Sequence, residues 1–136
     1  MKYYHIDPEV AGELGPNTTY RSTFPTVVDQ MEYLFDRWPA DEFVQAHPCF
    51  AVSNELRALL ENVNLTGVRF GICRVGKTDY FEDRDQAIPQ FSRLEVSGVV
   101  GRDDFGLSKN HHLIVSERVK QILDRRGLSQ CTFSEV

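Results

Sequence analysis

Two stretches of this sequence follow the same pattern, and that pattern constrains the fold more than any other feature. "FAVSNELRALLENVNLTGVRF" covers residues 50–70 and "LIVSERVKQILDRRGLSQCTF" covers residues 113–133, a shift of 63 positions. Five of the 21 aligned positions are identical, among them Ser53 with Ser116. Each stretch predicts a short apolar strand, a serine, an amphipathic helix and a returning strand, so residues 50–70 and 113–133 form an internal pseudo-repeat.

The helices are predicted from hydrophobic spacing. Leu56, Leu59, Leu60 and Val63 fall at i, i+3, i+4 and i+7, which places them on one face of a helix. A serine hydroxyl just before a helix accepts a hydrogen bond from a free backbone amide of the first turn. The two aligned serines are therefore expected to be structural N-caps.

The remaining segments predict further strands and one more helix. The alternation in "MEYLFD" predicts a strand that buries Met31, Tyr33 and Phe35 on one face. Proline suits a helix start and disfavours helix at the residue before it, so "RWPADEFVQAHP" predicts a short third helix between Pro39 and Pro48. We expect an α+β fold, with residues 1–136 as a single domain containing a mixed β-sheet, two serine-capped helices and the short third helix. Other expected elements are an edge strand in "KYYHI", a loop in "DPEVAGELGPN", strands in "CFAV", "VRFGICRV", "RLEVSGVVG" and "HLIV", and a long surface loop in "GKTDYFEDRDQAIPQF".

Composition narrows the class of protein. A chain of 136 residues with 41% hydrophobic and 26% charged residues is typical of a globular domain, and its formal net charge of -5 argues against nucleic acid or an anionic membrane as partner. Cys49, Cys73 and Cys131 form no C-x-x-C pair, which favours reduced thiols. The stretch "MKYYHIDPEV" lacks the apolar run of a secretory signal, and no window approaches the roughly 18 apolar residues of a membrane span. We expect a cytoplasmic protein without cofactor or metal, and a homodimer remains open.

The stretch "DDFGLSKNHHLIV" contains residue types that bind metals. Asp103, Asp104, His111 and His112 would suit a metal-dependent hydrolase, but neighbouring histidines on a strand point to opposite faces and cannot easily share one ion. The aspartates also suit a turn after the preceding strand. The turn interpretation is favoured, and the hydrolase stays as an alternative.

Nucleophilic catalysis has no motif in this sequence. Ser53 and Ser116 lie outside any G-x-S-x-G pattern, and capping alone explains both. The cysteines lie in apolar strands, where burial raises the thiol pKa and makes the sulfur inert. No G-x-G-x-x-G or P-loop is present. We therefore expect no catalytic residues and no enzyme activity.

Two segments are candidates for binding another protein. "TDYFEDRDQ" places Asp79, Glu82, Asp83 and Asp85 around Tyr80 and Phe81. Acidic charge steers a basic partner, and loop aromatics anchor interfaces, although the same aromatics would suit a loop that folds back on itself. Trp38, in "FDRWPADEF", is either a core residue, which is the favoured interpretation, or a further anchor.

The sequence also resembles a known family. "KYYHIDPEVAGELGPNT", "FDRWPADEFVQAHPCFAVSNELRALLENVNLTG" and "GRDDFGLSKNHHLIVSERVKQIL" occur in this order, with "DDFGLS" and "HHLIVSER" as the most specific pieces. They resemble a family of small bacterial proteins assigned as immunity proteins of polymorphic toxin systems, over nearly the whole chain. The resemblance implies an antitoxin that neutralises a cognate toxin domain by stoichiometric binding. An adaptor protein of a secretion or signalling system remains an alternative.

Overall fold

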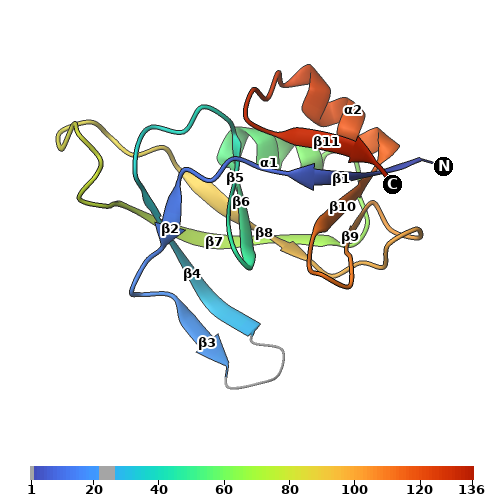
Figure 1. Cartoon of the computed structure of the whole chain (residues 1–136), viewed down its shortest axis with the longest axis horizontal. Coiled ribbons are helices and arrows are strands. Elements are labelled where there is room, and N and C mark those ends of the chain that lie inside the picture. The colour runs from blue at the N-terminus through green and yellow to red at the C-terminus, as the bar shows by residue number, and fades with distance from the viewer. Residues whose placement is uncertain (1, 22–26) are drawn as a thin grey trace.

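The chain folds mainly into strands, and helices are a minor component (Figure 1). In this computed structural model, which describes residues 2–21 and 27–136, strands account for 44% and helices for 13%. The expected α+β class is therefore wrong. The protein is mostly β, with two helices and a nearly closed, barrel-like sheet.

The strands form a smaller and a larger sheet. The smaller sheet has the order β11 (Thr132–Glu135), β1 (Tyr3–Asp7), β10 (Leu113–Ser116) and β9 (Phe105–Leu107), with every neighbouring pair antiparallel. The larger sheet has the order β2 (Gly12–Leu14), β4 (Val27–Phe35), β7 (Val68–Lys77), β8 (Phe91–Val96), β6 (Cys49–Ser53) and β5 (Phe43–Ala46), and β3 (Thr19–Arg21) also pairs with β4. Since β4 and β7 are parallel and the other pairs antiparallel, the larger sheet is mixed.

The two ends of the larger sheet approach each other. Glu9, just before β2, forms an isolated parallel bridge with Val44 of β5. The backbone N–H of Gln45 donates to the carbonyl oxygen of Glu9 at 2.8 Å. These contacts bring β2 beside β5 and explain why the sheet is nearly closed.

The internal repeat of the sequence has a counterpart in the strand order. The order β7-β8-β6-β5 in the larger sheet matches β11-β1-β10-β9 in the smaller, and every pair in both sets is antiparallel. The cross-strand register matches too. In the larger sheet Leu94 of β8 pairs with Phe70 and Phe50, and in the smaller sheet Ile6 of β1 pairs with Phe133 and Leu113, their counterparts in the repeat. The chain therefore contains two equivalent four-stranded units, each with one helix, and β2, β3 and β4 extend the first unit.

Both predicted serine caps are confirmed. α1 (Asn54–Glu61) follows Ser53 and α2 (Glu117–Arg125) follows Ser116, and each serine Oγ accepts from the backbone N–H three residues later. Each hydroxyl also donates to a carboxylate, Ser53 to Glu42 at 2.8 Å and Ser116 to Asp104 at 2.7 Å. The backbone N–H of each serine donates to the carbonyl oxygen of the same acidic residue at 2.8 Å. The two caps are thus built in the same way.

Two aspartates join the units to each other. The backbone N–H of Thr66, in the loop after α1, donates to Asp104 at 3.0 Å. The backbone N–H of Ser129, in the loop after α2, donates to Asp41 at 2.7 Å. Both the aspartates and their donors are 63 positions apart. We call these contacts the reciprocal aspartate clamps, because each unit's aspartate holds the loop of the other.

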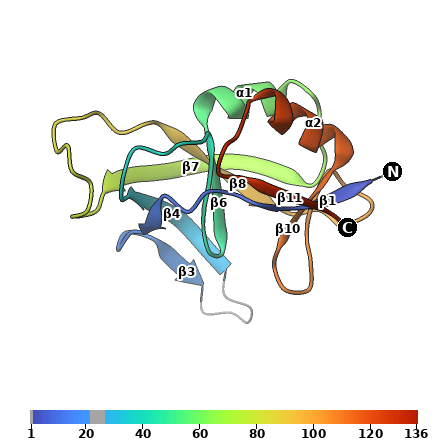
Figure 2. The same ribbon diagram turned by 45° about the horizontal axis from the view of Figure 1, so that its top comes forward.

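The helices lie side by side on one side of the sheets (Figure 2). Their buried faces use Leu56 and Leu60 from α1 and Val119, Ile122 and Leu123 from α2. No helix within residues 2–21 and 27–136 has the length and apolar character required to cross a membrane.

Two hydrophobic cores follow from this arrangement. The first lies under the helices in the repeated units, and the second lies between the extension and the strands of the first unit. Fully or nearly fully buried residues of the first core include Phe43, Val52, Phe105, Leu113 and Val115. Those of the second include Val28, Phe81 and Phe91, together with Met31, Tyr33 and Phe35, which share one face of β4 as predicted.

Three sequence expectations in the N-terminal part were wrong. No helix forms between Pro39 and Pro48, where β5 lies instead, because pairing with β6 buries Phe43 and Val44. The first strand is not at an edge, since β1 lies between β10 and β11. The expected loop after it contains β2, which pairs with the end of β4.

Candidate functional site

The four residues of the hydrolase alternative do not come together. Asp104 lies at the end of the β9–β10 hairpin that holds Ser116, whereas His111 and His112 lie in its turn at the opposite end. Asp103 accepts from the backbone N–H of Val99 at 2.7 Å. Both aspartates are thus occupied by structural hydrogen bonds. Within the described ranges, no group of three or more His, Cys, Asp or Glu side chains is arranged to hold a metal ion.

The two predicted binding segments do come together. Trp38 and Tyr80 line one hollow of about 280 Å³, although they are far apart in the sequence. Trp38 is 47% exposed and Tyr80 is 79% exposed, so the expectation of a core tryptophan was wrong. Glu82 and Asp83 line the same hollow. We define the Trp38–Tyr80 surface as Trp38, Tyr80 and the loop carboxylates Asp79, Glu82, Asp83 and Asp85.

Buried hydrogen bonds hold the turn that carries Trp38. The Glu9 carboxylate, whose side chain is only 1% exposed, accepts from the backbone N–H groups of Ala40 and Asp41 at 3.1 and 2.9 Å. It also accepts from the Arg37 guanidinium at 2.9 Å. Because a buried carboxylate fixes the residues on both sides of Trp38, the exposed indole stands on a rigid turn.

The acidic loop is attached to the same frame. Thr78 donates its hydroxyl to Asp36 at 2.7 Å, which links the start of the loop to the turn before Trp38. Phe81 is only 2% exposed and packs in the second core under the Lys77 ammonium, which lies 4.7 Å from its ring centroid. Phe81 thus anchors the loop and is unavailable to a partner. Tyr80 remains on the outside.

Three carboxylates of this surface form no salt bridge with a described residue, and the one cationic side chain in the lining of the hollow, Arg37, pairs with Glu9. Asp79, Glu82 and Asp85 are exposed, and none of them forms a salt bridge with another described residue. Asp83 differs, since its Oδ1 accepts from the backbone N–H of Asp85 and shapes the loop. Exposed aromatic rings beside unpaired negative charge suit a cationic protein surface.

Trp38 also borders a second hollow of about 430 Å³ on the side of α1. Its walls include Asp41 and Glu42, two carboxylates that hold the segment after α2. Hydrogen bonds from Arg126 lower the pKa of Glu42, so this carboxylate stays ionised over the neutral range. The indole therefore lies between two concave regions, each of which carries acidic side chains.

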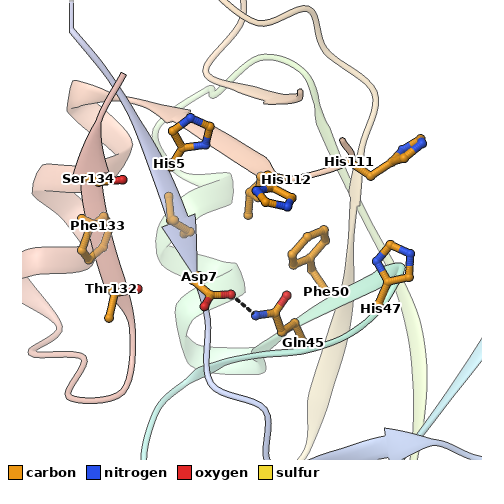
Figure 3. Close-up of a pocket in the computed structure, with 12 residues that line it drawn as sticks. His5, Asp7, Gln45, His47, Phe50, His111, His112, Thr132, Phe133 and Ser134 are labelled. Atoms are coloured by element: carbon orange, nitrogen blue, oxygen red, sulfur yellow. Dashed lines mark hydrogen bonds between the residues drawn. The ribbon is translucent and has the colours of Figure 1, made fainter. Parts of the chain in front are cut away.

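A larger pocket of about 640 Å³ lies between the smaller sheet and the β5–β6 hairpin (Figure 3). All four histidines of the sequence line it: His5, His47, His111 and His112. The rings of His5 and His112 meet edge to face with centroids 6.3 Å apart. No sequence pattern predicts this pocket, because its histidines come from three separate segments that only the fold brings together.

The comparisons with known proteins add no relative to this picture. Neither the scan against protein-family models nor the search of curated proteins finds a match to the chain.

Proposed function

We propose that this protein is an immunity protein that neutralises a cognate toxin domain by binding it in a stoichiometric complex. The observation that carries the proposal is the Trp38–Tyr80 surface, in which two exposed aromatic rings share a hollow with the unpaired carboxylate of Glu82. The sequence resemblance to toxin immunity proteins points in the same direction. The partner is inferred to be a toxin domain with a cationic surface.

The aromatic residues are suited to be the anchors of such a complex. Tryptophan and tyrosine are enriched among the residues that carry most of the binding energy of protein interfaces. Trp38 lies on a turn fixed by Glu9, and Tyr80 precedes the buried Phe81. A surface that is already ordered loses little conformational freedom on binding, which favours affinity.

The carboxylates are suited to speed up association. The chain carries a formal net charge of -5, and Asp79, Glu82 and Asp85 add exposed negative charge beside the two rings. Electrostatic steering of this kind raises the association rate of oppositely charged proteins and weakens with added salt.

The test begins with the protein encoded beside this gene. If it carries a toxin domain, co-expression of our chain should restore growth and the two proteins should co-purify in a 1:1 complex. Trp38→Ala and Tyr80→Ala should each lower the affinity by about tenfold or more. Tyr20→Ala is a matched control, because Tyr20 is 53% exposed on β3, outside the surface.

A charge reversal tests the steering. The double substitution Asp79→Lys and Glu82→Lys should slow association and reduce its salt dependence. The matched control is the double substitution Glu61→Lys and Glu135→Lys. It changes the net charge by the same amount, but on α1 and β11, outside the Trp38–Tyr80 surface. Equal association rates for the two double variants would contradict the proposed surface. Binding without rescue of growth would instead favour an adaptor.

A further inference from the structure

The histidine pocket is a second candidate site and shares no lining residue with the Trp38–Tyr80 surface. Its histidines come from β1, from the β5–β6 turn and from the segment before β10. Figure 3 shows His112 and His47 beside Phe50, with His5 beyond His112 on β1 and His111 at the outer end. At about 640 Å³ the pocket has the size of sites that enclose a small ligand or a side chain with part of its backbone.

The acceptors of the pocket lie at one end. Asp7 is exposed and supplies the only carboxylate among the lining residues. Gln45 uses its side-chain Nε2 to donate both to Asp7 and to the carbonyl oxygen of Pro8, the latter at 2.8 Å. The side-chain oxygen of Gln45 is thereby turned toward Phe50 and the pocket interior (Figure 3). While the imidazoles are neutral, the pocket carries one negative charge and several acceptors beside aromatic rings.

We propose that this pocket binds the guanidinium group of an arginine side chain from a protein partner. A guanidinium is planar, always charged and rich in N–H donors, so it pairs with the carboxylate of Asp7 and the oxygen of Gln45. Its flat faces stack on aromatic rings, which Phe50 and the imidazoles supply. The neutral nitrogen of an imidazole accepts a further hydrogen bond.

Other ligand classes fit less well. An anion would meet the negative charge of Asp7 without a basic side chain among the lining residues other than histidine. A metal ion would need converging ligands, and the described part of the chain contains no group of three that could hold one. A lysine ammonium would pair with Asp7 but lacks the planar face for the rings.

The composition of the pocket makes binding sensitive to acid. The titratable groups that face it are His5 and Asp7 from β1, His47 from the β5–β6 turn, and His111 and His112 from the segment before β10; the lining residues of β11 are Thr132, Phe133 and Ser134. Histidine is the side chain whose charge changes between about pH 5 and 8. Acidification therefore adds positive charge and repels a guanidinium.

The experiment uses N-acetyl-arginine amide, with N-acetyl-citrulline amide as an uncharged analogue of the same shape, in titrations followed by NMR chemical shifts. The arginine derivative should shift the signals of His5, Gln45 and His112, and the citrulline derivative should not. Asp7→Asn should weaken binding by about tenfold or more. Asp103→Asn, at an aspartate outside the pocket, should not change it.

The second part of the experiment measures the affinity for the arginine derivative as a function of pH. Affinity should fall between about pH 7.5 and pH 5.5, and replacing His5 and His112 by glutamine should reduce that fall. Spectra of each free variant establish that it is folded. The proposal would be overturned if N-acetyl-citrulline amide bound as tightly as N-acetyl-arginine amide, or if a folded Asp7→Asn variant kept full affinity for the arginine derivative. Shifts confined to the Trp38–Tyr80 surface would do the same, and none of these outcomes depends on whether a toxin is neutralised.

Discussion

Asp104 accepts hydrogen bonds both from the serine that caps α2 and from the loop after α1. Its carboxylate accepts from Ser116 Oγ, from the Thr66 backbone N–H and from both Nε and a terminal nitrogen of Arg118, at 2.7 to 3.1 Å. Burial raises the pKa of this carboxyl, but the hydrogen bonds outweigh burial and lower the pKa to about 2. The group therefore stays ionised in the folded protein to unusually low pH.

We predict that Asp104→Asn lowers the free energy of unfolding by about 2 kcal/mol at pH 7. Because the folded pKa lies below the ordinary 3.8, the contribution of the carboxylate is present above that pH and disappears as the pH falls toward 2. Urea unfolding of both proteins at neutral and acid pH measures this. The exposed Asp85→Asn is the control, and a difference that persists at low pH would contradict the explanation.

The thiols provide a second residue-scale prediction. Burial raises the pKa of Cys73 to about 12 and that of Cys131 to about 12, and it also raises the pKa of Cys49. Since the thiolate is the reactive form, the native protein should react with Ellman's reagent far more slowly than the urea-unfolded chain. Rapid labelling of Cys73 in the folded state would show that its strand opens readily.

The two helices allow the caps to be compared at the scale of elements. Ser116 is 1% exposed, whereas Ser53 is only partly buried. Each substitution removes a cap and one donor to a carboxylate, but the Asp104 side chain is more buried than that of Glu42, at 11% against 26% exposed. Ser53→Ala should therefore destabilise the protein by about 1 kcal/mol and Ser116→Ala by about 2 kcal/mol. Chemical unfolding measures both. Ser97→Ala, at an exposed serine outside the helices, should lie within about 0.5 kcal/mol of the parent.

Local sequence pattern identified the two helices and β4 but missed β2 and β5. The serines and leucines of α1 and α2 satisfy short-range rules, so their sequence predicts them well. The segment of β5 obeys weak short-range rules, and its partner β6 decides its conformation. The same limit applies to the sites, because the pairing of distant strands is what brings Trp38 and Tyr80 to one hollow and His5 and His47 to one pocket.

At the scale of the whole molecule, the two equivalent four-stranded units predict that the protein tolerates circular permutation. The two ends of the chain are close (Figure 1). The backbone N–H of Val136 donates to the Tyr3 carbonyl oxygen at 2.9 Å, and Lys2 Nζ lies 3.9 Å from Glu135 Oε1. A short linker between them would join β11 to β1, as the 78–90 loop joins β7 to β8. A circular permutant opened between the exposed Gln86 and Ala87 should fold with stability within about 2 kcal/mol of the parent.

Circular dichroism and urea unfolding of the permutant measure this. A matched permutant opened inside β7, between Ile72 and Cys73, should fail to fold because it interrupts the strand that joins β4 to β8. If both permutants fold equally well, strand continuity is not what holds the larger sheet together.

The reciprocal aspartate clamps also bear on how the protein is made. A ribosome releases the chain from its N-terminus, so Asp41 leaves the exit tunnel long before Ser129, and β1 leaves long before β10 and β11. Neither half can complete its hydrogen bonds while the last helix is still being synthesised. Folding of the native structure is therefore completed only after α2, the loop that carries Ser129 and β11 have left the ribosome.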